Sequence, residues 1–225
     1  MLGLAALAAL AAMAFVGVGS ASADTLCKVH AETCPEASRF PVPTTIHAFA
    51  KEARLLSGEI ETVCESLIEG ATSKNLGAHK GLEGLINTVT FKNCTGACDF
   101  VTGDSAENLP YKVIGLGLNE AGKYVNTEGT LHVFGHKLGA HELAGLLNDC
   151  TVFNFDCLYG ATSALMTFLP HKPVVGALAL KPATIHAKVS LLRVGHSGFC
   201  PATAQWHALY DVTKPAGLVA LSPKP

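Results

Sequence analysis

Short segments in which apolar and polar residues alternate recur along most of the chain. Residues 44–50, 60–68 and 203–213 alternate with a period of two, as half-buried strands do. Glycine, proline, asparagine and aspartate separate about a dozen such segments, and only residues 51–56 suggest a short helix. The pattern predicts an all-β fold, either a sandwich or a barrel of antiparallel sheets.

One sequence pattern occurs twice. Residues 76–87 and 138–148 share eight of eleven positions once one residue of the first copy is skipped, and each copy leads into an apolar segment that ends in cysteine. Self-similarity of this kind indicates a duplicated structural unit. We therefore expect one all-β region over residues 24–225, built from two related halves, with lobes at 24–120 and 121–225 as one arrangement.

The first 23 residues have the features of a cleaved export signal. Residues 2–18 are apolar, and Ala21-Ser22-Ala23 matches the small-x-small site of signal peptidases, although no Lys or Arg precedes the apolar stretch. A membrane anchor is the alternative, but the stretch is shorter than the ~20 apolar residues of a spanning helix and contains glycines. We expect a secreted or cell-surface protein that begins at Asp24 and has no transmembrane segment.

Charge is balanced along the chain. The 18 acidic and 16 basic residues are interspersed. A protein that binds nucleic acid usually concentrates positive charge in one stretch or on one face. The charge pattern therefore argues against nucleic acid as a partner. Because we expect the protein to be exported, we expect an extracellular or cell-envelope ligand, which the sequence does not identify.

All eight cysteines follow the export signal, which favours disulfide bonds over thiolate chemistry. Eight cysteines allow 105 connectivities, so the sequence does not fix the pairing. Pairing the nearest cysteines predicts the bonds Cys27–Cys34, Cys94–Cys98, Cys150–Cys157 and, by remainder, Cys64–Cys200. At the usual ~2–4 kcal/mol for each bond, reduction should weaken the fold severely.

Histidines are the candidate metal ligands. His132, His136 and His141 fall within ten residues, but on a straight strand His141 faces away from the other two. His141 also begins a near match to the zinc protease motif, in which Gly145 replaces the second histidine. His79 occupies the matching position of the first repeat copy. Structural or surface histidines remain the favoured interpretation, and no metal or cofactor is expected.

Motifs of catalytic centres are incomplete. Residues 195–199, GHSGF, begin like a nucleophile elbow but end in phenylalanine, and residues 103–105, GDS, match a serine protease loop only over those positions. Cys94 and Cys98 are separated by three residues, where a redox motif has two. We assign no catalytic residue. Carboxylates that converge only in the fold keep a secreted hydrolase as an alternative.

The aromatic residues Trp206 and Tyr210 are the candidate ligand-binding pair. They share one face of the strand predicted at 203–213. On an exposed sheet, such a pair would stack against sugar rings and would define a carbohydrate-binding module. The only tryptophan of an all-β chain more often lies in the core, which is the favoured interpretation.

The two ends of the chain resemble segments of known exported proteins. The opening TLCKVHAETCP, residues 25–35, and the closing FCPATAQWHALYDVTKP, residues 199–215, resemble uncharacterised exported, cysteine-rich β proteins of high-GC Gram-positive bacteria. The similarity is specific at these two ends of the chain; His207 and the many internal histidines depart from it. The resemblance implies an exported, disulfide-bearing β protein and supplies no activity or ligand.

Together these features predict an exported β protein at the cell surface or outside the cell, with a structural or binding role and an unknown ligand. A secreted hydrolase acting on an extracellular polymer and a carbohydrate-binding module that uses Trp206 and Tyr210 are the alternatives.

Overall fold

The computed structural model describes residues 25–75, 82–96, 106–123, 128–138, 141–150, 155–170, 172–173, 180–196, 199–217 and 219–222. In these residues the regular structure is all strand except for one 3-10 helix, Glu36–Ser38, which confirms the predicted fold class. The first strands are β1 (Thr25–Cys27), β2 (Thr45–Ser57), β3 (Ile60–Asn75), β4 (Leu82–Gly96), β5 (Ala106–Glu107), β6 (Tyr111–Leu116), β7 (Gly129–Phe134) and β8 (His136–Leu138). They are followed by β9 (His141–Cys150), β10 (Phe155–Ala161), β11 (Ser163–Leu169), β12 (Lys172–Pro173), β13 (Leu180–Lys181), β14 (Thr184–His196), β15 (Thr203–Lys214) and β16 (Ala220–Ser222).

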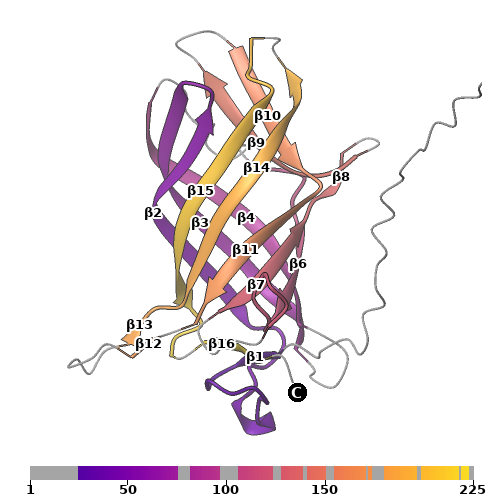
Figure 1. The fold of residues 1–225 in the computed structure, drawn as a ribbon, viewed down its shortest axis with the longest axis vertical. Helices are drawn as coiled ribbons and strands as arrows, with labels where there is room; N and C mark the ends of the chain where they lie inside the picture. The colour runs from indigo at the N-terminus through magenta and orange to yellow at the C-terminus, as the bar shows by residue number, and fades with distance from the viewer. Residues whose placement is uncertain are drawn as a thin grey trace, which may run out of the picture.

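Eight antiparallel strands form a closed barrel (Figure 1). Their order around the barrel is β11, β7, β6, β4, β3, β2, β15 and β14. Pairing between β11 and β14, from Met166 opposite Ala187 to Leu169 opposite Thr184, closes the circle. Of the two predicted architectures, the barrel is the one observed. Closure pairs the edges that an open sheet of these strands would leave exposed.

The alternation in the sequence separates the inside of the barrel from its outside. On β15 the buried residues are Ala204, Trp206, Ala208, Tyr210 and Val212. Between them, Leu209 points outward and is 52 % exposed. Successive side chains of a strand point to opposite faces, so this period of two places every second residue in the barrel interior.

Strand β14 takes part in two pairings. Its first residues pair with β11, whereas Leu192 to His196 pair with β10. Strand β10 continues the sheet to β9, which also pairs with the short strands β5 and β8. In Figure 1, β9 and β10 lie in the upper part of the molecule, next to β14. We call β9 and β10 the upper extension.

The lower end of the barrel in Figure 1 is covered by the two ends of the described chain. Strand β1 pairs with β16, and residues 38–40 lie along the other side of β1, where the Phe40 amide donates to the Leu26 carbonyl at 3.1 Å. We call residues 25–40 and 219–222 the terminal cap. All residues of β1 and β16 are buried, because they close the barrel.

Two related halves are not shown by the structure. The described part of the first repeat copy lies on β4 in the barrel wall, while the second lies on β8 and β9 outside it. The barrel takes strands from both 24–120 and 121–225, so these ranges are not separate lobes. Residues 51–56 are part of β2 and not a helix. A bulge between Ala50 and Ala53 interrupts the alternation of buried and exposed residues, so the sequence pattern did not indicate a strand there.

The disulfides join residues that the sheet brings together. The bonds among described residues are Cys27–Cys34, Cys64–Cys94 and Cys157–Cys200. The prediction for Cys27–Cys34 is confirmed. The predicted pairs Cys94–Cys98, Cys150–Cys157 and Cys64–Cys200 are wrong, because pairing of β3 with β4 brings Cys64 to Cys94, and pairing of β10 with β14 brings Cys157 toward the segment before Cys200. Cys98 and the side chain of Cys150 lie outside the described residues.

The three bonds are compatible with an extracellular location, because disulfides persist in oxidising compartments. The proposed signal, residues 1–23, lies outside the described residues.

In the described part of the chain, no helix has the length and apolar character needed to span a membrane.

Candidate functional site

The inside of the barrel combines small and large side chains. On the eight barrel strands, the alanines with at most 8 % exposure are Ala48, Ala50, Ala53, Ala164, Ala187, Ala204 and Ala208. Among them stand large rings, of which Phe91 and Trp206 meet edge to face with centroids 5.5 Å apart. The interior of an eight-stranded barrel is just wide enough to be filled by side chains or to hold one small ligand. With this many alanines, the interior is not completely filled.

The larger space, cavity A, lies against the terminal cap and has a volume of about 110 Å³. Leu26, Val219 and Leu221 of the cap form its floor, and Ala48 and Phe168 belong to its side walls. Apolar atoms form the surface that faces this space.

A smaller space, cavity B, lies further up the barrel and has a volume of about 70 Å³. Its walls include Phe91, Ala164, Leu191, Trp206 and Tyr210. Its lining is also almost wholly apolar.

The two cavities follow one another along the strands. On β11, Phe168 lines cavity A, and Ala164, on the same face of the strand, lines cavity B. On β15, Val212 lines cavity A and Tyr210 lines cavity B. Four side chains line both spaces and form the partition between them: Ile68, Ile86, Val133 and Met166.

Polar groups in the barrel interior are hydrogen-bonded to one another. The Tyr210 hydroxyl lies 3.1 Å from Ser66 Oγ, and it also accepts a hydrogen bond from the Trp206 indole. Burial raises the pKa of Tyr210 to about 12, because the phenolate would lose its hydration, while the bonds to Ser66 and Trp206 offset part of this rise. The phenol is therefore neutral at physiological pH, and its hydroxyl is committed to the protein.

The carboxylate of Glu83 is directed away from the apolar lining of cavity A. Glu83 lies on β4 beside cavity A, but its oxygens contact Lys74 at 2.8 Å and Lys112 at 3.5 Å. A hydrogen bond from Lys74, the largest cause, lowers the pKa of Glu83, and the charge of Lys112 adds to this effect. The carboxylate is thus ionised and paired at the outer surface.

Two glycines provide room for leucine side chains inside the barrel. A Cβ atom at Gly115 would lie 2.4 Å from Leu82 Cδ2 and 3.5 Å from Leu221 Cδ2. A Cβ atom at Gly129 would lie 3.0 Å from Leu221 Cδ1. The missing side chain at Gly129 therefore leaves room for Leu221, and the missing side chain at Gly115 leaves room for Leu82 of β4.

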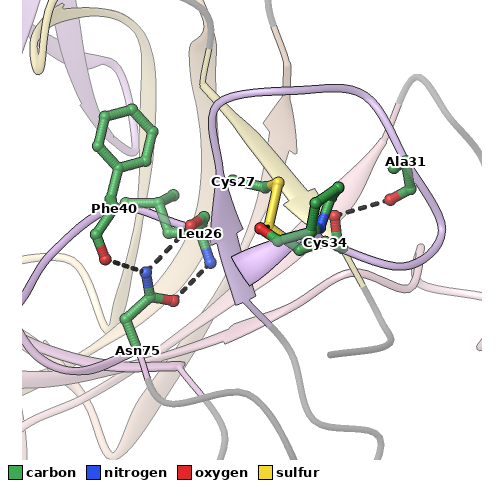
Figure 2. Close-up of a disulfide and its surroundings, with 8 residues drawn as sticks. Leu26, Cys27, Ala31, Cys34, Phe40 and Asn75 are labelled. Carbon is green, nitrogen blue, oxygen red and sulfur yellow. Dashed lines mark hydrogen bonds between the residues drawn. A yellow bond between two sulfur atoms is a disulfide. The ribbon is translucent and has the colours of Figure 1, made fainter. Parts of the chain in front are cut away.

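One side chain fastens the cap to the barrel. Asn75, at the end of β3, is 4 % exposed. Its Oδ1 accepts from the Leu26 amide at 2.7 Å, and its Nδ2 donates to the carbonyls of Leu26 at 3.0 Å and Phe40 at 2.7 Å, as Figure 2 shows. The Cys27–Cys34 bond closes the loop beside these contacts (Figure 2). The floor of cavity A is therefore a fixed part of the fold.

The upper extension is also attached through a buried polar contact. The hydroxyl of Tyr159 on β10 lies 2.5 Å from Ser57 Oγ at the end of β2. Burial raises the pKa of Tyr159, which keeps the phenol protonated for this hydrogen bond.

The candidate aromatic pair lies inside the barrel. Trp206 is 5 % exposed and Tyr210 1 % exposed, so both are core residues, as favoured from the sequence. The exposed stacking platform for sugar is therefore wrong. Both residues instead line cavity B.

Of the candidate metal ligands, His132 is the one whose side chain the structure describes. His132 lies on β7, with its ring centroid 6.2 Å from that of Phe134. His136 and His141 lie on β8 and β9, and their side chains are outside the described residues, as is His79. Over the part of the chain that the structure describes, no three His, Cys, Asp or Glu residues are grouped to hold a metal ion.

Most of the two near-catalytic segments falls outside the described residues. Residues 103–105 and 197–198 lie outside the described residues, and Phe199, at the end of the apparent nucleophile elbow, is 84 % exposed.

The sequence analysis missed the residues that create the cavities. The alternation could have identified the inward alanines, since Ala48 and Ala208 keep the phase of their strands. It could not show that the cap enters the barrel, because Leu26 and Leu221 are 195 positions apart and belong to segments too short for a periodic pattern.

Comparison of this chain with protein-family models, with curated proteins and with solved structures found no match.

Proposed function

We propose that the protein is an exported binding protein that holds a small apolar molecule inside its barrel. The observation that carries this proposal is the pair of adjoining apolar cavities, about 110 and 70 Å³, within a closed barrel. Export is a further part of the proposal. Three disulfides support it, because such bonds persist in oxidising compartments.

An empty interior of this size is costly. Cavities destabilise a protein by about 24 cal/mol per Å³, so these two would cost about 4 kcal/mol when empty. That is a large part of the ~5–15 kcal/mol by which folded domains are stable. Larger residues in place of Ala48 or Ala164 would remove the cost. Retained space of this kind is typical of a ligand site, and an engineered apolar cavity of about 150 Å³ binds benzene.

The alternative of a secreted hydrolase receives no support from the described residues. It requires a concave site with converging carboxylates or a histidine and a carboxylate. The carboxylate nearest to either cavity belongs to Glu83, which is paired with two lysines at the surface. The carbohydrate-binding module loses its exposed platform with the burial of Trp206 and Tyr210.

Dissolved benzene is expected to raise the melting temperature of the purified full chain by several degrees. A ligand at 100 times its dissociation constant stabilises the folded state by about 2.7 kcal/mol, and about 1 kcal/mol corresponds to about 2–4 °C in a protein of this size. Calorimetry with increasing benzene measures the shift.

The control is Leu209→Ser, which changes the outer face of β15 and should show the same shift as the unmodified protein. A melting temperature that does not respond to benzene at saturation would contradict the proposed function.

A further inference from the structure

Resting on the proposed function, we infer that the ligand is an uncharged, elongated hydrocarbon that occupies both cavities at once. Neither a fatty acid nor a sugar has the chemistry that the interior accepts. Three features of the barrel lead to this conclusion: its polar groups are already paired, its cavities lie in line, and the partition between them contains a flexible side chain.

The first feature is that the described polar groups of the lining already form hydrogen bonds within the protein. Tyr210 is bonded to Ser66 and Trp206, and Thr72 Oγ1 accepts from the Thr44 amide at 2.8 Å. The carboxylate of Glu83 is paired outside. A hydroxyl or carboxylate placed in the cavities would lose its hydration without gaining a partner, which disfavours such ligands strongly.

The second feature is shape. Cavity A extends from the cap leucines to the partition, and cavity B continues from the partition to Trp206 and Leu191. Each space alone is small, at about 110 and 70 Å³, so a larger ligand has to use both. A molecule that uses both must be narrow and extend along the strands, as an alkyl chain does.

The third feature is the partition itself. Of its four side chains, Ile68, Ile86 and Val133 are β-branched and stiff. Met166 is unbranched and adapts its shape to its surroundings, and it is only partly buried. A change in the rotamer of Met166 joins cavity A to cavity B without movement of the backbone.

The test of polarity compares n-octane, 1-octanol and octanoate on the full chain. Trp206, the single tryptophan, reports occupancy of cavity B through its fluorescence, and calorimetry reports binding anywhere. We expect n-octane to bind at least about tenfold more tightly than 1-octanol and octanoate to show no binding, because an unpaired polar group is left buried. Octanoate binding as tight as that of n-octane would overturn the inference.

The test of length uses variants that fill one cavity each. Ala48→Leu fills cavity A and Ala164→Leu fills cavity B, with Leu209→Ser on the outer face as the control. We expect each filling variant to weaken n-octane binding at least tenfold and the control to leave it unchanged. If leucine prevents folding at either position, Ala48→Val and Ala164→Val replace the variants, with smaller losses in the same direction.

The outcomes separate the two proposals. If only Ala48→Leu weakens n-octane, the ligand occupies cavity A alone, and the inference falls while the proposed function stands. If benzene does not change the melting temperature of the unmodified protein, the proposed function falls and the inference falls with it. If benzene binds but n-octane does not, only the inference falls.

Discussion

Replacing Cys157 and Cys200 together with alanine is expected to lower the free energy of unfolding by about 4 kcal/mol. The bond closes a loop with a sequence separation of 43, and cross-links over long loops remove the most entropy from the unfolded chain. The pair also ties β10 to the segment that follows β14, so its loss frees the upper extension. Denaturant unfolding followed by circular dichroism measures the change.

The matched control is the double replacement of Cys27 and Cys34 with alanine. Their bond closes a loop with a sequence separation of only 7, so its loss should lower the free energy of unfolding by about 2 kcal/mol. A loss no larger than that of the Cys27 and Cys34 control would contradict the expected effect of loop length.

The second large effect is expected for Asn75→Ala, which should lower the free energy of unfolding by about 3 kcal/mol. The substitution removes three hydrogen bonds and leaves the Leu26 amide and the Phe40 carbonyl buried without this partner. Each buried group left unsatisfied costs about 1–3 kcal/mol. Because the cap forms the floor of cavity A, its loosening should also weaken the binding of benzene.

Ser73→Ala, an exposed position two residues away on β3, is the control and should change stability by less than about 0.5 kcal/mol. Hydrogen exchange at the Leu26 amide locates the effect. Unchanged protection of that amide in Asn75→Ala would contradict the role of Asn75 in holding the cap.

The fold class followed from local pattern, because alternation reports which face of a strand is buried. β15 illustrates this: Trp206 and Tyr210 share the phase of three alanine and valine neighbours, and all are inside the barrel. The choice between sandwich and barrel depended on the pairing of β11 with β14, which no local pattern encodes.

The disulfides show the same limit. Cys27 and Cys34 pair within a short loop, where proximity in sequence is a sufficient guide. Cys64 pairs with Cys94 because β3 and β4 are neighbours, and the sequence offered Cys94 a closer cysteine at position 98. Strand pairing, not loop length, decided the outcome.

The cavities could not be predicted from the sequence for a further reason. An alanine in phase with a buried face predicts burial, but the space beside it depends on the side chains opposite. At Ala48 that space is bounded by Leu26 and Leu221 from the two ends of the chain. The repeat at 76–87 and 138–148, the most prominent sequence feature, contributes instead to two different parts of the sheet.

A crystal structure of the protein under xenon pressure tests the central claim most directly. Xenon enters dry apolar cavities of this kind and identifies itself by its electron density. We expect xenon inside the barrel, in cavity A between Ala48 and the cap residue Leu221, and in cavity B beside Trp206. A barrel interior closed by side chains, with no xenon at either position, would contradict it.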